Sequence, residues 1–109
     1  MDVLGLIQEQ VTIDNYEFSL HAEQEREDEH ILVEELEQSV ASGELLEDYP
    51  DDPRGHSCLI FGSSQSGRPI HSVWGLLPDG RVRVITVYIP LPPKWIDPRT
   101  RRSRRNDAV

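Results

Sequence analysis

The chain has 109 residues, of which 37% are hydrophobic, and this is enough for one modest core and one domain. Its net charge of −9 is unusual for a general nucleic-acid binder, because affinity for phosphates comes largely from clustered Lys and Arg. No apolar run approaches the roughly 20 residues that span a bilayer, so we expect no membrane segment. The single cysteine, Cys58, excludes an intrachain disulfide and the acidic N-terminus does not resemble a secretory signal, so we expect a cytoplasmic protein.

The charges are divided unevenly along the chain. Residues 1–53 carry 17 acidic side chains against Arg26 alone, whereas residues 54–109 carry 10 basic side chains against three aspartates. This asymmetry indicates either a basic binding surface on an acidic body or attraction between the two halves. Any contact with RNA should therefore be local.

Three helices are expected in the first part of the chain. Apolar residues at helical spacing predict an amphipathic helix over residues 2–12. Ser19 can cap a second helix that runs to about Glu29 and is almost entirely polar, so this helix should lie on the surface. A third helix, with apolar residues at i, i+3 and i+7 from Val33, should end at Gly43 in a left-handed C-cap.

Four strands should follow as an antiparallel meander. They are expected at residues 45–49, at residues 57–62, and on either side of the turn Asp79-Gly80 within residues 68–88. Helices first and strands afterwards predict an α+β protein, with the helices packed on one face of the sheet. We expect this single domain to occupy residues 1–96.

The end of the chain should differ from the domain. The proline-rich segment 89–95 favours an extended exit that Trp95 anchors onto the domain. Residues 97–109 contain five arginines and almost nothing apolar, which predicts a flexible basic tail. RNA phosphates, an acidic partner and the acidic half of the domain are all candidate contacts for this tail.

The hairpin of residues 68–88 carries the best candidates for chemistry. Asp79-Gly80 between two β-rich runs is a strong signal for a two-residue turn, and counting back from it places His71 opposite Tyr88. One face should then carry His71, Val73, Gly75, Leu77, Val82, Val84, Thr86 and Tyr88, and the other Ser72, Trp74, Leu76, Arg81, Arg83, Ile85 and Val87.

Two interpretations of the pair His71 and Tyr88 stay open. An imidazole and a phenol on one face, with Arg68 and Arg83 nearby, could perform acid–base chemistry on a phosphodiester. Alternatively, the two side chains merely pack, because both faces of the hairpin are substantially apolar. His21 is a further candidate, although an exposed histidine that can pair with Glu25 at i+4 is usually ordinary.

Metal and nucleotide sites are not expected. Among the histidines and Cys58, only His56-Ser57-Cys58 has close spacing, and no second pair accompanies it. Gly62 and Gly67 have the spacing of a phosphate-binding P-loop, but Arg68-Pro69 stands where Lys and Ser or Thr are needed. The sequence therefore predicts no cofactor.

Several segments, in the right order, carry a resemblance to a known family. They are Phe18 to Gln24, Gly43-Glu44, Tyr49-Pro50, Asp52 to Gly55, Ser57 to Ile60, Arg68 to His71, and Ile85 to Pro90. Together they resemble a bacterial family, common in cyanobacteria, that is catalogued as domain of unknown function 4258. The resemblance covers about residues 16–96.

The resemblance implies an activity and a partner. The family is similar to the RelE, BrnT and MqsR toxins, which are compact α+β ribonucleases that cleave RNA without metal and are neutralised by an antitoxin. It implies a RelE-like or barnase-like fold and a zinc-finger antitoxin-like partner. The implied function is that of an mRNA-interferase-type endonuclease in a type II toxin–antitoxin module, with RNA as substrate. The alternative is a non-catalytic interaction or regulatory module of the same family.

The resemblance also assigns residues. It implies catalytic roles for His21, His71 and Tyr88, and it leaves Arg68, Arg83 and Thr86 as candidates for binding RNA phosphates. Glu25 and Glu29 stand where many relatives carry Arg, so the second helix is unusually acidic for RNA to lie across it.

Overall fold

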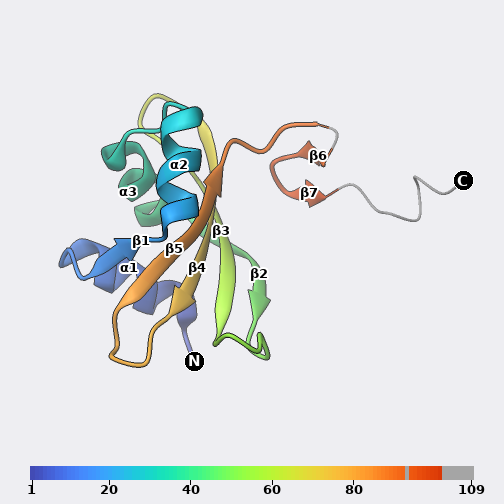
Figure 1. Ribbon diagram of the computed structural model, residues 1–109. Coiled ribbons are helices and arrows are strands. Elements are labelled where there is room, and N and C mark those ends of the chain that lie inside the picture. The colour runs from blue at the N-terminus through green and yellow to red at the C-terminus, as the bar shows by residue number, and fades with distance from the viewer. Residues whose placement is uncertain (93, 102–109) are drawn as a thin grey trace, which may run out of the picture.

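The computed structural model describes residues 1–92 and 94–101. Within these residues the chain forms three helices and seven strands (Figure 1). In chain order they are α1 (Val3–Thr12), β1 (Tyr16–Phe18), α2 (Leu20–Asp28), α3 (Val33–Ala41), β2 (Glu44–Tyr49), β3 (Ser57–Ser63), β4 (Pro69–Leu76), β5 (Val82–Tyr88), β6 (Trp95–Asp97) and β7 (Thr100–Arg101).

The main sheet is mixed rather than purely antiparallel. Its five strands lie in the order β1-β5-β4-β3-β2, and β2 to β5 form the expected antiparallel meander. β1 adds a fifth strand, which pairs with β5 in parallel. The α+β class is confirmed, whereas the four-stranded sheet is wrong because Tyr16–Phe18 is too short for its alternation to stand out in the sequence.

The three helices lie together on one side of the main sheet (Figure 1), and the core lies between the two layers. α1 and α3 direct apolar side chains such as Ile7 and Leu36 into this core, as their periodicity predicts. α2 buries only Ala22, in agreement with its polar sequence. We call the sheet face that the helices cover the inner face, and the opposite one the outer face.

Most helix boundaries agree with the sequence, but the expected C-cap does not. Ser19 caps α2, since its Oγ accepts a hydrogen bond from the backbone N–H of Ala22 at 3.0 Å. Gly43 is not left-handed, and the described glycines with positive φ are Gly55, Gly67 and Gly80. A Cβ atom at Gly43 would lie 2.6 Å from the backbone oxygen of Ser39, so this glycine allows close packing at the start of β2.

The β4–β5 hairpin has the expected pairing of His71 with Tyr88, but it reaches that pairing differently. Its loop has three residues, because the N–H of Leu77 donates to the carbonyl of Arg81 at 2.9 Å and Gly80 has a φ of 91°. A bulge at Ile85 then shifts the register back by one residue. The two irregularities cancel at His71.

Between the loop and the bulge, the predicted faces are therefore reversed. Trp74 lies opposite Val84, and Leu76 lies opposite Val82, so both valines face the helices and are fully buried. Arg83 instead lies opposite Gly75 on the outer face. The assignment of Val82 and Val84 to the face of His71 was wrong, because a two-residue turn does not form.

The last described residues lie against the outer face. β6 and β7 form a separate two-stranded sheet on the side of the main sheet that is opposite the helices (Figure 1). Trp95 is 2% exposed, which confirms that it anchors the segment. We call residues 94–101 the C-terminal strap. Residues 102–109, where most of the basic tail was expected, lie outside the described residues, and the flexibility of the tail stays a prediction.

Candidate functional site

The candidate site is centred on His71 in β4. Its Nδ1 atom lies 3.2 Å from the hydroxyl oxygen of Tyr88, and its Nε2 atom lies 2.7 Å from the carbonyl oxygen of Pro98. A carbonyl can only accept, so Nε2 carries a proton, and in the neutral ring Nδ1 accepts from the Tyr88 hydroxyl. Both nitrogens of the imidazole are thus hydrogen-bonded.

Aromatic rings enclose the imidazole. The Trp95 ring meets it edge-on with centroids 4.3 Å apart, and the rings of Tyr88 and Phe61 lie at 5.3 and 5.7 Å. His71 has no exposed surface at all. In this arrangement a substrate cannot reach the ring without displacing Trp95 or Pro98.

Burial sets the protonation of both partners. Desolvation lowers the pKa of His71 below its ordinary value, although the Pro98 carbonyl and the nearby Glu47 carboxylate act in the opposite direction. Desolvation also raises the pKa of Tyr88. Both side chains are therefore neutral near pH 7, which suits a histidine that accepts a proton and a phenol that holds it in place.

The C-terminal strap is attached to the sheet through arginines as well as through Trp95. Arg99 makes an ion pair with Glu44 at 2.7 Å, and Arg101 makes one with Glu47 at 2.8 Å. The guanidinium of Arg99 also lies over the ring of Phe61, and that of Arg101 lies over the strap's own Trp95. Lys94 approaches the ring of Tyr88 at 5.9 Å, so three cations gather around the buried imidazole.

The carboxylate of Glu47 connects the strap to the outer face. Burial alone would raise its pKa, but hydrogen bonds from Arg101 and Tyr49 hold the pKa below its usual value. The same contacts act on Tyr49, where burial and the hydrogen bond to Glu47 raise the pKa to about 12. Glu47 is therefore an anion that accepts hydrogen bonds from Tyr49 and Arg101 at the edge of the site.

His21 and Thr86 belong to a neighbouring cluster around Glu25. The carboxylate of Glu25 pairs with the imidazole of His21 at 3.2 Å and accepts hydrogen bonds from the Thr86 hydroxyl and from the N–H of Val87. Glu25 thereby accepts a hydrogen bond from a backbone N–H of β5 beyond the residues that pair with β1. Within the described residues, His21 forms no hydrogen bond or ion pair with His71 or Tyr88.

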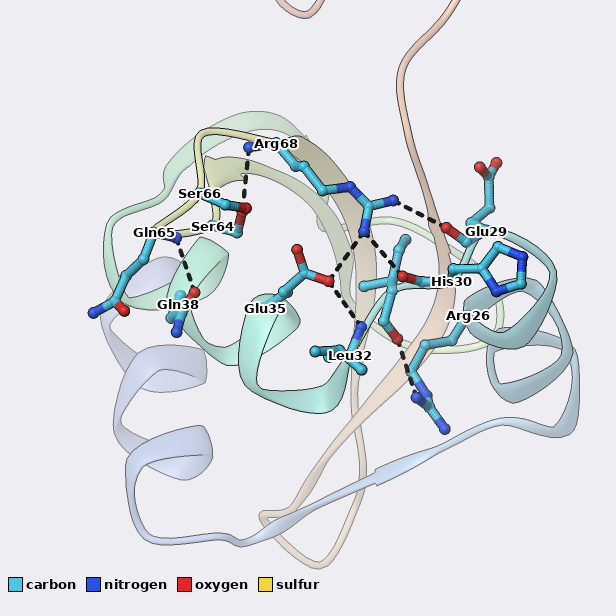
Figure 2. A network of polar contacts seen from close by, with 11 residues as sticks. Arg26, Glu29, His30, Leu32, Glu35, Gln38, Ser64, Gln65, Ser66 and Arg68 are labelled. Carbon is cyan, nitrogen blue, oxygen red and sulfur yellow. Dashed lines mark hydrogen bonds and ion pairs between the residues drawn. The ribbon is translucent and has the colours of Figure 1, made fainter.

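Arg68 is engaged by the connection between α2 and α3 (Figure 2). Its guanidinium donates to the backbone carbonyls of Glu29 and His30 at 2.9 Å and to the carboxylate of Glu35 at 3.0 Å. Glu35 in turn accepts from the N–H of Leu32 at the start of α3. Arg68 therefore stabilises the end of one helix and the beginning of the next.

Arg83 lies on the outer face but away from His71. Its Nε donates to Glu17 at 2.8 Å, and Arg81 donates to the other oxygen of the same carboxylate at 2.5 Å. Both Arg68 and Arg83 are thus paired, and the cations that surround His71 come from the strap instead. Sequence reasoning missed these strap residues because it treated them as part of a tail.

A second histidine pair was also missed. His56 Nε2 lies 2.5 Å from Asp48, and His56 borders a hollow of about 190 Å³ that Arg83 and Ile85 also line. The turn residues 50–55 were the feature of the sequence that could have indicated this pair, because they connect β2 to β3 and bring residues 48 and 56 together. Hydrogen bonds from Arg54 and Ser57 lower the pKa of the nearby Asp52 to about 2.

Two observations limit the chemistry of the described residues. No cluster of three or more His, Cys, Asp or Glu side chains in residues 1–92 and 94–101 is arranged to hold a metal ion. No helix in the same residues is long and apolar enough to cross a membrane.

These residues define an α+β domain in which a basic strap covers a histidine–tyrosine pair. The family described as Domain of unknown function (DUF4258) matches residues 18–89, and the chain belongs to this family. No curated protein and no solved structure gives a significant match. A relationship with RelE, BrnT or MqsR toxins stays a prediction.

Proposed function

We propose that the protein is the toxin-like component of a toxin–antitoxin module and that it cleaves RNA without a metal ion at the outer face. The observation that carries this proposal is the hydrogen bond between His71 and Tyr88 in the midst of three strap cations. A base and positive charges for a phosphate are the two requirements of metal-independent RNA cleavage.

The reaction follows from these groups. In the open site, Nε2 of His71 takes the proton from a ribose 2′-hydroxyl, and the 2′-oxygen attacks the adjacent phosphorus. The bond from phosphorus to the 5′-oxygen then breaks, that oxygen takes a proton from solvent water, and a 2′,3′-cyclic phosphate is left behind. For this step the single ring proton of the neutral imidazole must be on Nδ1, which then donates to the Tyr88 oxygen, so that Nε2 is free to accept once the Pro98 carbonyl has left.

The remaining candidates have supporting roles in this proposal. Lys94, Arg99 and Arg101 lie over the rings that enclose His71 and would stabilise the charge on the pentavalent phosphorus. Arg68 and Arg83 would contact phosphates farther along the strand after exchanging their carboxylate partners. His21 and Thr86 would contribute through Glu25 rather than directly.

The test is cleavage of mixed RNA by the purified protein in the presence of a chelator. The His71→Gln and Tyr88→Phe variants should both cleave more slowly, and loss of the histidine should cost at least about 100-fold. His56→Gln is the matched control, because His56 pairs with Asp48 outside the His71 site. Equal cleavage by the wild type and the His71→Gln variant would falsify the assignment.

A second candidate function is a non-catalytic interaction module. The observation in its favour is the complete burial of His71, together with the pairing of Arg68 and Arg83 to carboxylates. This function predicts no RNA cleavage by any variant and a protein complex that weakens as salt is added. A zinc-finger antitoxin-like protein is the proposed partner under either function.

A further inference from the structure

The C-terminal strap occupies the one position of His71 that could face a substrate. Nδ1 is held within the sheet by Tyr88, so only Nε2 remains for chemistry. The carbonyl of Pro98 accepts a hydrogen bond from that atom at 2.7 Å. As long as the strap is docked, His71 has neither a free nitrogen nor any exposed surface.

The ion pairs that hold the strap, in addition to the buried Trp95, are of the kind that water and ions can replace. The side chains of Arg99 and Glu44 are 63% and 48% exposed, so their ion pair is weak and screened by salt. The pair of Arg101 with Glu47 is only partly shielded. A two-stranded sheet such as β6–β7 is marginally stable alone, so the strap keeps its shape only while these side chains remain docked.

Trp95, which anchors the strap, has an incompletely satisfied hydrogen-bond donor. The indole Nε1 of Trp95 is buried and lies near the Tyr88 hydroxyl, but it forms no hydrogen bond of ordinary geometry with any described residue. A buried donor without a well-formed hydrogen bond is costly, and this cost disappears when the side chain returns to water. The cost offsets part of the stabilisation that burial of the Trp95 ring provides.

The connection to β5 allows the strap to move as a unit. Pro90 is buried against the domain, whereas Leu91 and Pro92 are exposed. The expected extended exit is not formed here, because the N–H of Trp95 donates to the carbonyl of Leu91 at 3.3 Å and closes a turn. Movement at the exposed residues Leu91 and Pro92 would carry Trp95 and Pro98 away together.

We propose that the C-terminal strap is an autoinhibitory cover of His71 and that the phosphates of RNA displace it by competing with Glu44 and Glu47 for Arg99 and Arg101. Phosphate accepts two hydrogen bonds from a guanidinium as a carboxylate does, and an RNA strand offers many phosphates in a row. The released arginines then hold the substrate beside the uncovered imidazole. The nature of the displacing ligand depends on the proposed function, whereas the covering of His71 does not.

The cover can be tested without RNA by chemical labelling of histidines. Diethyl pyrocarbonate modifies accessible imidazoles, and mass spectrometry of the full-length protein reports each site. In the Glu44→Gln/Glu47→Gln variant, which loses both ion pairs from the sheet side, His71 should be labelled about fivefold faster than in the wild type. His21, whose side chain is 70% exposed, is the internal reference.

Two further variants make this test specific. Arg99→Gln/Arg101→Gln removes the same pairs from the strap side, together with the cation–π contacts, and should accelerate labelling by about tenfold. Glu27→Gln/Glu34→Gln changes the charge by the same amount on the helices and should leave the labelling of His71 unchanged. Circular dichroism confirms that each variant is folded, and quenching of Trp95 fluorescence by acrylamide is a second readout of release.

The outcomes separate the cover from the proposed function. Slow labelling of His71 in both folded variants, or equal acceleration in the Glu27→Gln/Glu34→Gln control, overturns the cover. Fast labelling without RNA cleavage supports the cover and contradicts the nuclease. If both proposals hold, the Glu44→Gln/Glu47→Gln variant cleaves RNA faster than the wild type, whereas Arg99→Gln/Arg101→Gln is open but gains no activity.

Discussion

The two faces of the main sheet each bury a tryptophan, and they do so differently. On the inner face, Trp74 is fully buried and its indole N–H donates to the Ser72 hydroxyl at 2.8 Å. On the outer face, Trp95 is almost as buried but its indole N–H has no partner among the described residues. Trp74 belongs to the core between the sheet and the helices, whereas Trp95 belongs to the strap and lies between the rings of the outer face and the guanidinium of Arg101. The inner face is thus built for stability, whereas the outer face is closed by contacts that can open.

The largest expected difference is between the two tryptophans. Trp74→Ala should lower the free energy of unfolding by about 3 to 5 kcal/mol, because it leaves a large cavity in the core. Trp95→Ala should cost much less, since the strap can detach while the sheet and helices stay folded. Urea unfolding followed by circular dichroism measures both. Equal losses would show that the strap is an integral part of the folded domain.

The next comparison is between Arg68, whose hydrogen-bond network joins α2 to α3, and Arg81, whose side chain forms surface ion pairs. Arg68→Ala should cost about 1 to 2 kcal/mol, because two backbone carbonyls and Glu35 lose a charged donor (Figure 2). Arg81→Ala is the control, since Arg81 makes only side-chain pairs at the surface. If the two variants are equally stable, the network of Figure 2 does not stabilise the α2–α3 connection.

The pH dependence of stability should distinguish the two faces as well. The folded state lowers the pKa of His71 below 6.5, so its stabilising contribution is complete above pH 6.5 and is lost as the pH falls through the lower, folded value. Below pH 6.5 the wild type should therefore lose stability more steeply than His71→Gln. The charged and titratable groups around His71 are Glu47, Tyr88, Lys94 and Arg101, and they are common to both proteins. Parallel pH profiles would contradict a buried neutral imidazole.

The smallest expected effect belongs to a single strap contact. Arg101→Gln should change the free energy of unfolding by less than about 1 kcal/mol, because its ion pair with Glu47 is partly exposed. The same variant should still increase acrylamide quenching of Trp95, since the guanidinium covers that ring at 4.6 Å. A large loss of stability without any change in quenching would indicate that the strap belongs to the core.

The sequence predicted those features that depend on local patterns. Helical periodicity located α1 and α3, and the Asp79-Gly80 signal led to the pairing of His71 with Tyr88. That pairing is correct because the longer loop and the bulge at Ile85 cancel, whereas the faces of Val82 and Val84 were wrong because the Asp-Gly signal does not distinguish a three-residue loop from a two-residue turn.

The features that sequence reasoning missed depend on contacts between distant residues. The hydrogen-bond partner of His71 Nε2 is the backbone carbonyl of Pro98. Every residue type has a backbone carbonyl, so the sequence could not identify Pro98 as this partner. Arg68 was expected to bind phosphate, but the carbonyls that engage it come from a helix end 38 and 39 residues away. The arginines of the strap were assigned to a tail because their partners, Glu44 and Glu47, lie in β2.

The most direct test of a nuclease site beneath the strap is RNA cleavage in chelator by the Glu44→Gln/Glu47→Gln variant, with and without His71→Gln. The opened variant should cleave faster than the wild type, and the added His71→Gln should remove that activity by about 100-fold or more. Cleavage that is unchanged by His71→Gln, or absent from a variant whose His71 is accessible to label, would contradict the account.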